Sequence, residues 1–147
     1  MIKQQLCRLL VGRCCVPADQ ILSLAMSLVG NAREEILVTM DLAEELTKPL
    51  PTDYFHLLGS RMKEGVRLVR AGFGTEEDAH AFEERVPVTF ATYKFFRVAN
   101  GTVYQRMMLA DRQNLLYAVD TRHGRRFFSS SRKGDARTFL QYFERLG

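Results

Sequence analysis

Cysteine is scarce in this sequence. Its 147 residues include three cysteines, Cys7, Cys14 and Cys15, all within the first fifteen positions. An odd number of cysteines does not suit a disulfide framework, and neither a C-x-x-C pair nor a histidine at ligand spacing accompanies them. We therefore expect buried or half-buried thiols, no metal site, no cofactor and a cytoplasmic location.

Long apolar runs are also missing. No stretch approaches the roughly 18 apolar residues that a membrane-spanning helix needs. The N-terminal segment is interrupted by Arg8 and Arg13, so it makes a poor signal peptide. We predict a chain without a transmembrane segment, in which residues 1–16 form a basic helical extension and residues 17–147 form a single domain.

Charge of neither sign dominates the sequence. It has 21 Lys and Arg against 17 Asp and Glu, a net charge of +4. The pI of 9.1 permits an anionic partner without requiring one, and the chain is far less basic than most dedicated nucleic-acid-binding modules. The acidic pairs Glu34-Glu35 and Glu44-Glu45 have no obvious partners in the sequence, and we expect them to be solvated.

The apolar residues predict helices that alternate with strands. Helices are expected over residues 17–31, from Thr52 or Asp53 to Gly65, from an N-cap at Thr75 to Pro87, and over residues 135–146. The second of these helices should bury Phe55, Leu58 and Met62.

Strands are expected over residues 35–40, 66–71, 88–98, 102–111 and 114–121. Asn100-Gly101 predicts a hairpin between the third and fourth strands. Residues 122–134 are expected to form a basic loop. This order of elements predicts an α/β protein, a three-layer sandwich with a mixed β-sheet.

The segment YQRMMLAD, residues 104–111, places polar side chains in an otherwise apolar strand. Tyr104, Arg106 and Asp111 have the spacing Y-x-R-x-x-x-x-D. Strand residues two apart point to the same face, about 6.6 Å from each other, so Tyr104 and Arg106 are expected to line one pocket. Arg106 carries a permanent charge and a planar fork of donors that suits phosphate or carboxylate.

This spacing and the order of elements resemble one half of the phospholipase D-like superfamily. Its signature, H-x-K-x-x-x-x-D, lies on a strand that follows a β-α-β-α-β run. Tyr104 stands in the place of the histidine and Arg106 in that of the lysine, while Asp111 is retained. The resemblance covers residue 17 to the C-terminus as topology and spacing, and extends distantly to the sensory domain of archaeal sugar-responsive transcription regulators. Since active members combine two motifs, it implies a homodimer.

The departures from the signature favour binding over catalysis. In active relatives the histidine attacks phosphorus, the lysine binds phosphoryl oxygens and the aspartate buttresses the site. A tyrosine hydroxyl, with a reference pKa near 10, is a poor nucleophile at neutral pH. The Gly-Ser and Asn that active members carry on the next strand are replaced by YAVDT, residues 117–121. We therefore predict a non-catalytic binding or regulatory module for a phosphate-containing or other anionic ligand.

Two further functions stay open at this stage. A phosphodiesterase or nuclease acting as a homodimer would use Tyr104, Arg106 and Asp111 in catalysis. A scaffold or membrane-surface adaptor would use none of them, and Tyr104 and Arg106 would then simply lie on the outer face of a strand. The archaeal regulators carry a DNA-binding winged helix ahead of this fold. Because about sixteen residues precede it here, we do not expect direct operator binding.

The segment 122–133 is basic and contains no acid. Phe127 and Phe128 interrupt its five cations, a combination that suits nucleic acid phosphates with stacked bases or an anionic small molecule. The alternative is a solvated loop that the phenylalanines anchor. We expect Arg125 and Arg126 to join Arg106 in an anion-binding pocket at the seam of a dimer.

Overall fold

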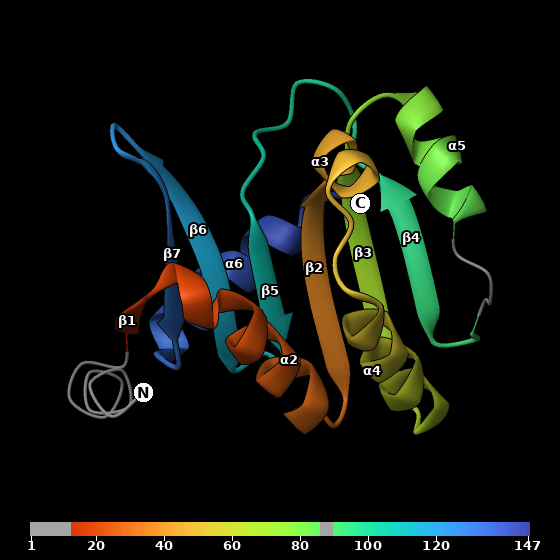
Figure 1. The fold of residues 1–147 in the computed structure, drawn as a ribbon. Helices are drawn as coiled ribbons and strands as arrows, with labels where there is room; N and C mark the ends of the chain where they lie inside the picture. Colours follow the sequence, from red (N-terminus) through yellow and green to blue (C-terminus); the bar gives the residue numbers. More distant parts are fainter. Residues whose placement is uncertain (1–12, 86–89) are drawn as a thin grey trace.

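A computed structural model describes residues 13–85 and 90–147, which form a seven-stranded sheet with helices on both faces (Figure 1). In chain order the elements are β1 (Arg13–Val16), the 3-10 turn η1 (Ala18–Gln20), α2 (Ile21–Asn31), β2 (Glu35–Asp41), α3 (Leu42–Thr47), α4 (Thr52–Lys63), β3 (Arg67–Phe73), α5 (Glu76–Glu84), β4 (Tyr93–Arg97), β5 (Met107–Ala110), β6 (Asn114–Thr121), β7 (Gly124–Ser130) and α6 (Lys133–Glu144).

The sheet is mixed. Its strand order is β1-β7-β6-β5-β2-β3-β4. The pairs β2–β3 and β3–β4 are parallel, and the remaining neighbours are antiparallel. The predicted three-layer α/β sandwich with a mixed sheet is therefore confirmed.

Alternate residues of the central strands build the two sides of the core. Ile36 and Leu68 pack under α2 and α4 on one face, whereas Leu37 and Val69 pack against α6 on the other. Strand β2 is thus buried on both faces, as its continuous apolar run indicates. At the carboxyl end of β2, a smaller cluster that includes Leu42 joins α3 to α5.

The four predicted helices fall close to their expected positions, whereas α3 was not predicted. The Thr75 hydroxyl accepts the backbone N–H of Asp78 at 3.0 Å, which confirms the cap of α5; the predicted stop at Pro87 lies outside the described residues. In α4 the expected buried side was partly wrong, because Tyr54 and Leu58 face the core while Phe55 is 38% exposed. The helix is rotated so that Phe55 lies on its flank.

The predicted hairpin at Asn100-Gly101 is wrong. Gly101 does form a turn with φ of 90°. However, β4 pairs only with β3, while β5 pairs with β2 and β6, so β2 and β3 separate the two supposed partners. The segment between β4 and β5 instead crosses over the ends of β3 and β2 (Figure 1).

Two segments expected to be irregular or helical are strands. The predicted basic loop contains β7, which pairs with β6. In this strand Phe127 and Phe128 point to opposite faces of the sheet. The predicted N-terminal helix does not include residues 13–16, which form β1 and pair with β7. In β1 Cys14 is buried and Cys15 is exposed; residues 1–12, with Cys7, lie outside the described part of the chain.

Across residues 13–85 and 90–147, no helix is long and apolar enough to cross a membrane.

Candidate functional site

Tyr104 and Arg106 lie just ahead of β5, in a segment held between β2 and β6. The strand begins at Met107, later than predicted. The Thr39 hydroxyl donates to the carbonyl of Gln105 at 2.5 Å and accepts the N–H of Met107 at 2.9 Å. The carbonyl of Arg106 accepts the N–H of Ala118 at 3.1 Å. These bonds fix the backbone from which both side chains extend.

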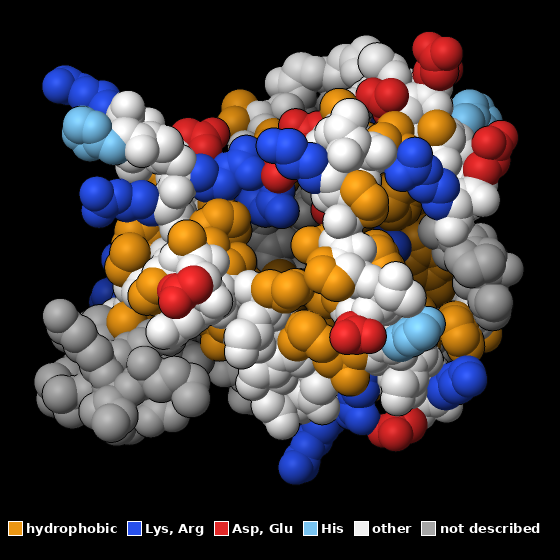
Figure 2. Space-filling view, in the orientation of Figure 1, with side chains coloured by type: hydrophobic (Ala, Val, Ile, Leu, Met, Phe, Trp, Pro, Cys, Tyr) orange, Lys and Arg blue, Asp and Glu red, His pale blue; other side chains and the backbone are white. Residues whose placement is uncertain are grey.

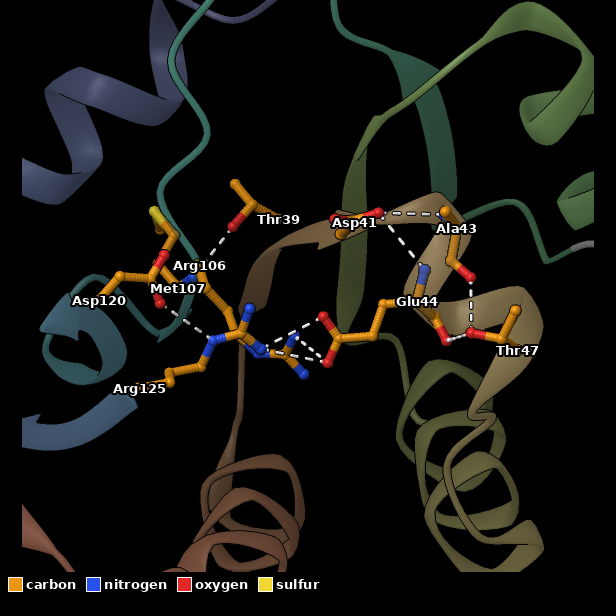
Figure 3. A network of polar contacts seen from close by, with 9 residues as sticks. All are labelled: Thr39, Asp41, Ala43, Glu44, Thr47, Arg106, Met107, Asp120 and Arg125. Carbon is orange, nitrogen blue, oxygen red and sulfur yellow. Dashed lines mark hydrogen bonds and ion pairs between the residues drawn. The ribbon is translucent and has the colours of Figure 1, made fainter. Parts of the chain in front are cut away.

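Two arginines from distant segments converge on one carboxylate (Figure 3). Arg106 Nη1 lies 3.1 Å from Oε1 of Glu44. Arg125 Nη1, from β7, lies 3.2 Å from each oxygen of the same carboxylate. Arg125 Nε also approaches Asp120 at 3.4 Å, and the Arg106 guanidinium lies 5.8 Å from the centre of the Phe127 ring.

The carboxylate of Glu44 is ionised at neutral pH. Partial burial acts to raise its pKa, but the charges and hydrogen bonds of Arg106 and Arg125 outweigh burial and hold the pKa below its ordinary value. Lys and Arg side chains gather beside a hollow in the surface between α2 and α3 (Figure 2). The chain therefore already holds one anionic group between two guanidinium groups at a hollowed surface.

The Tyr104 hydroxyl group is neutral. Its oxygen is buried beside Arg106, and its O–H group has no acceptor among the described residues. The ring packs against Phe73, with 4.9 Å between the ring centres. Burial raises the pKa of Tyr104 to about 12, although the Arg106 charge opposes this shift. At this position Tyr104 can donate a hydrogen bond, but it is not a phenolate nucleophile.

Asp111 does not share this surface with Tyr104 and Arg106, contrary to the sequence-based expectation. It lies past the other end of β5, and five residues of strand span roughly 16 Å. Its carboxylate accepts the backbone N–H groups of Arg33, Glu34 and Glu35 at 2.8–3.0 Å. Partial burial is outweighed by these donors, which lower the pKa of Asp111. Asp111 thus fixes the turn that leads into β2.

Arg126 is also separated from the arginine pair. Adjacent residues of a strand point to opposite faces, and Arg125 shares the face of Phe127. Arg126 shares the opposite face with Phe128, whose ring stacks on Tyr117 at 5.5 Å. Of the two arginines that sequence reasoning placed in the pocket, only Arg125 reaches Glu44.

Similar proteins were found only by structure, since no protein-family profile and no curated protein matches this chain. NucT from Helicobacter pylori aligns with a TM-score of 0.63 and 10% identity, over 91% of this chain and 92% of NucT. TrmBL2, described as an archaeal chromatin protein with a novel mode of DNA binding, aligns with a TM-score of 0.69 and 11% identity. Polyphosphate kinase from Porphyromonas gingivalis aligns with a TM-score of 0.63 and 14% identity.

The chain has the phospholipase D-like fold.

The extent of these likenesses differs between the neighbours. TrmBL2 matches 98% of this chain, which spans 58% of TrmBL2, and the kinase matches 91% of this chain, which spans 25% of the kinase. The resemblance inferred from the Tyr104–Asp111 spacing, including that to archaeal regulators, is confirmed as a likeness of fold.

Glu44 is the site residue that sequence reasoning missed. It was expected to be solvated, because the segment after β2 was not recognised as a helix. Asp41 caps α3, and its side chain accepts the N–H groups of Ala43 and Glu44 at 3.1 and 3.4 Å. An acidic cap followed three residues later by glutamate is a known helix-start signal, and it would have placed Glu44 on the first turn of α3.

Proposed function

We propose that this chain is a non-catalytic phospholipase D-like module that binds a phosphate-containing or other anionic ligand between Arg106 and Arg125. The observation that carries the proposal is the pair of guanidinium groups on one carboxylate, at 3.1 and 3.2 Å. Arginine forks bind phosphate as well as carboxylate. In this proposal the motif is a degenerate form of the family signature, with Tyr104 as a neutral donor beside the anion.

A ligand enters this site by displacing the Glu44 carboxylate. Glu44, Arg106 and Arg125 are all partly exposed, with 26–34% of each side chain accessible, so water and small anions reach them. Surface ion pairs of this kind contribute little net stability, which makes their exchange for an external anion feasible. Glu44 therefore acts as an internal competitor that keeps the arginine pair neutralised when no ligand is bound.

Two structural neighbours support phosphate as the anion. One is named a polyphosphate kinase and another is described as binding DNA, so the fold is used by proteins whose names refer to phosphate-bearing polymers. A regulatory module that senses a phosphorylated small molecule or a nucleic acid phosphate fits this fold. We further propose a cytoplasmic homodimer, because active members of the superfamily combine two motifs and this chain supplies one.

The test is titration of pyrophosphate into the whole chain by isothermal calorimetry. Loss of a hydrogen bond to a charged group costs about 1.5–3 kcal/mol, so Arg106→Ala should weaken binding at least about 10-fold. Arg126→Ala is the matched control. It removes one arginine from the position next to Arg125 in β7, where the side chain points to the opposite face of the sheet, so it should leave the affinity for pyrophosphate nearly unchanged. Unchanged affinity in Arg106→Ala would remove Arg106 from the site.

Glu44→Gln separates internal competition from simple loss of structure. The amide cannot neutralise both arginines, so this variant should bind pyrophosphate more tightly than the wild type. Weaker binding would show that Glu44 orients the arginines and does not compete with the ligand.

Incubation with single-stranded DNA and a chromogenic phosphodiester tests the competing enzymatic function. Turnover that Tyr104→Phe abolishes would replace the binding proposal by a phosphodiesterase.

A further inference from the structure

Arg70 is a buried cation on β3 that makes no contact with Glu44, the carboxylate shared by Arg106 and Arg125. Its side chain is only 7% exposed. Three rings surround its guanidinium carbon: Phe55 of α4 at 5.8 Å, Phe82 of α5 at 5.6 Å and Tyr93 of β4 at 5.7 Å from the ring centres. These distances are within the range of attractive cation–π contacts. The rings hold the guanidinium at a fixed position between two helices and the sheet.

No carboxylate neutralises Arg70. Within the described residues no ion pair includes it. The remaining residues, 1–12 and 86–89, contain neither Asp nor Glu. A buried cation without a paired anion is unfavourable, and cation–π contacts compensate only part of the lost hydration.

Glu45, on α3, lies within electrostatic range of Arg70. Arg70 and Arg106 both act on it, but burial has the larger influence and raises the pKa of its carboxyl. Glu45 forms no ion pair with Arg70, and no other carboxylate of the described residues contacts the guanidinium directly.

Tyr93 adds a second donor beside Arg70. Its hydroxyl oxygen is buried beside the Arg70 guanidinium, and its O–H group has no acceptor among the described residues. Burial raises its pKa, while the nearby Arg70 acts in the opposite direction, so the hydroxyl stays protonated at neutral pH. A buried hydroxyl without an acceptor is unusual in a folded protein. An oxyanion placed between Arg70 and Tyr93 would satisfy both side chains.

The surroundings of Arg70 are apolar and partly open. Figure 2 shows a hollow lined by hydrophobic side chains between α4 and α5, with Lys or Arg atoms visible between them. Phe55, on the α4 side, is 38% exposed, which is high for a phenylalanine that contacts a buried guanidinium. A ligand body in this hollow would cover the exposed part of the ring.

We propose that Arg70 anchors a second ligand site, for a carboxylate carried on a small aromatic or aliphatic body. One guanidinium fork matches one carboxylate in a bidentate geometry, and the Tyr93 hydroxyl donates to one of its oxygens. The body of the ligand packs against Phe55 and Phe82. A phosphate dianion fits less well, because Arg70 supplies a single positive charge in an apolar setting. This site is independent of the proposed anion site at Arg106 and Arg125.

The test compares benzoate, benzamide and inorganic phosphate as ligands of the whole chain, by saturation-transfer NMR and calorimetry. Benzoate should bind in the wild type, and Arg70→Met should weaken it at least tenfold, since methionine keeps an unbranched apolar chain and removes the charge. Arg67→Met is the matched control, three residues earlier on β3, where the side chain is 56% exposed and paired with Glu35. It should leave the affinity for benzoate unchanged.

Several results would overturn this site. The first is that wild type and Arg70→Met bind benzoate equally well. The second is that the wild type binds benzamide as well as benzoate. The third is that phosphate binds more tightly than benzoate and that Arg70→Met abolishes this phosphate binding. If Arg70→Met does not fold, as judged by circular dichroism, Tyr93→Phe supplies the decision. That variant removes one hydroxyl and should weaken benzoate several-fold; unchanged affinity would refute the proposal. Arg106→Ala should not affect benzoate, which keeps this test separate from that of the proposed function.

Discussion

Replacing Asp111 should destabilise the fold and leave anion binding intact. Its carboxylate accepts three backbone N–H groups, from Arg33, Glu34 and Glu35, at 2.8–3.0 Å. A hydrogen bond to a charged group contributes about 1.5–3 kcal/mol. Bonds that share one acceptor are not additive, so we expect the carboxylate to account for about 3 kcal/mol of the free energy of unfolding.

The backbone of Asp111 adds a second contribution. Asp111 and Arg112 have φ angles of 54° and 58°, in the left-handed region that few side chains favour. Aspartate tolerates this conformation better than alanine does, and the difference between glycine and alanine there is about 1 kcal/mol. Asp111→Ala should therefore lose about 4 kcal/mol and Asp111→Gly about 3 kcal/mol.

Urea unfolding at pH 7, followed by circular dichroism, measures both values. The midpoint should fall in both variants while the slope stays constant, because the area exposed on unfolding does not change. Pyrophosphate titration of the same samples should give wild-type affinity. A loss below about 1 kcal/mol in Asp111→Ala would refute the capping role. Weakened binding comparable to that of Arg106→Ala would return Asp111 to the ligand site.

Two further predictions concern the stability of the fold. Hydrogen-bond donors hold the pKa values of Glu44, Asp111 and Asp135 below their ordinary values despite partial burial. Their stabilising effect is complete above the unfolded-state values near 4 and is lost as pH falls through the lowered folded-state values, so the urea midpoint should decrease as the pH falls below about 4. Gly72→Ala places a Cβ 2.9 Å from both Leu42 Cδ2 and Phe95 Cε2, and it should cost about 1–3 kcal/mol in urea unfolding. A neutral effect would show that both side chains move aside at little cost.

The sequence predicts which segments are helices or strands better than it predicts which strands pair with each other. Local periodicity predicts α2, α4, α5 and α6 because each buries one side against the sheet. The neighbours of a strand depend on contacts far along the chain. The turn at Asn100-Gly101 has the local chemistry of a hairpin, yet β3 already pairs with β4 in parallel and β2 takes the next position. The chain beyond the turn then has to reach the free edge of β2.

The residues of the candidate site show the same difference between local and long-range contacts. Tyr104 and Arg106 are two residues apart, so strand geometry alone is enough to group them. Glu44 lies 62 residues before Arg106 and 81 residues before Arg125, and no sequence spacing relates these ion-pair partners. Arg125 was predicted as part of the site for its charge and Arg126 for the same reason. Only the pairing of β7 with β6 decides which of these two arginines points toward Glu44.

The proposal of binding over catalysis depends on the state of Tyr104. Burial raises the pKa of Tyr104 to about 12, so its hydroxyl is protonated at neutral pH and nucleophilic attack would require a base. The arginines are engaged with Glu44, and both catalysis and binding require its displacement. Binding requires nothing more, because a displaced carboxylate leaves two permanently charged forks and a neutral hydroxyl beside the incoming anion. A catalytic role needs the further change at Tyr104, which makes binding the smaller step from the structure observed.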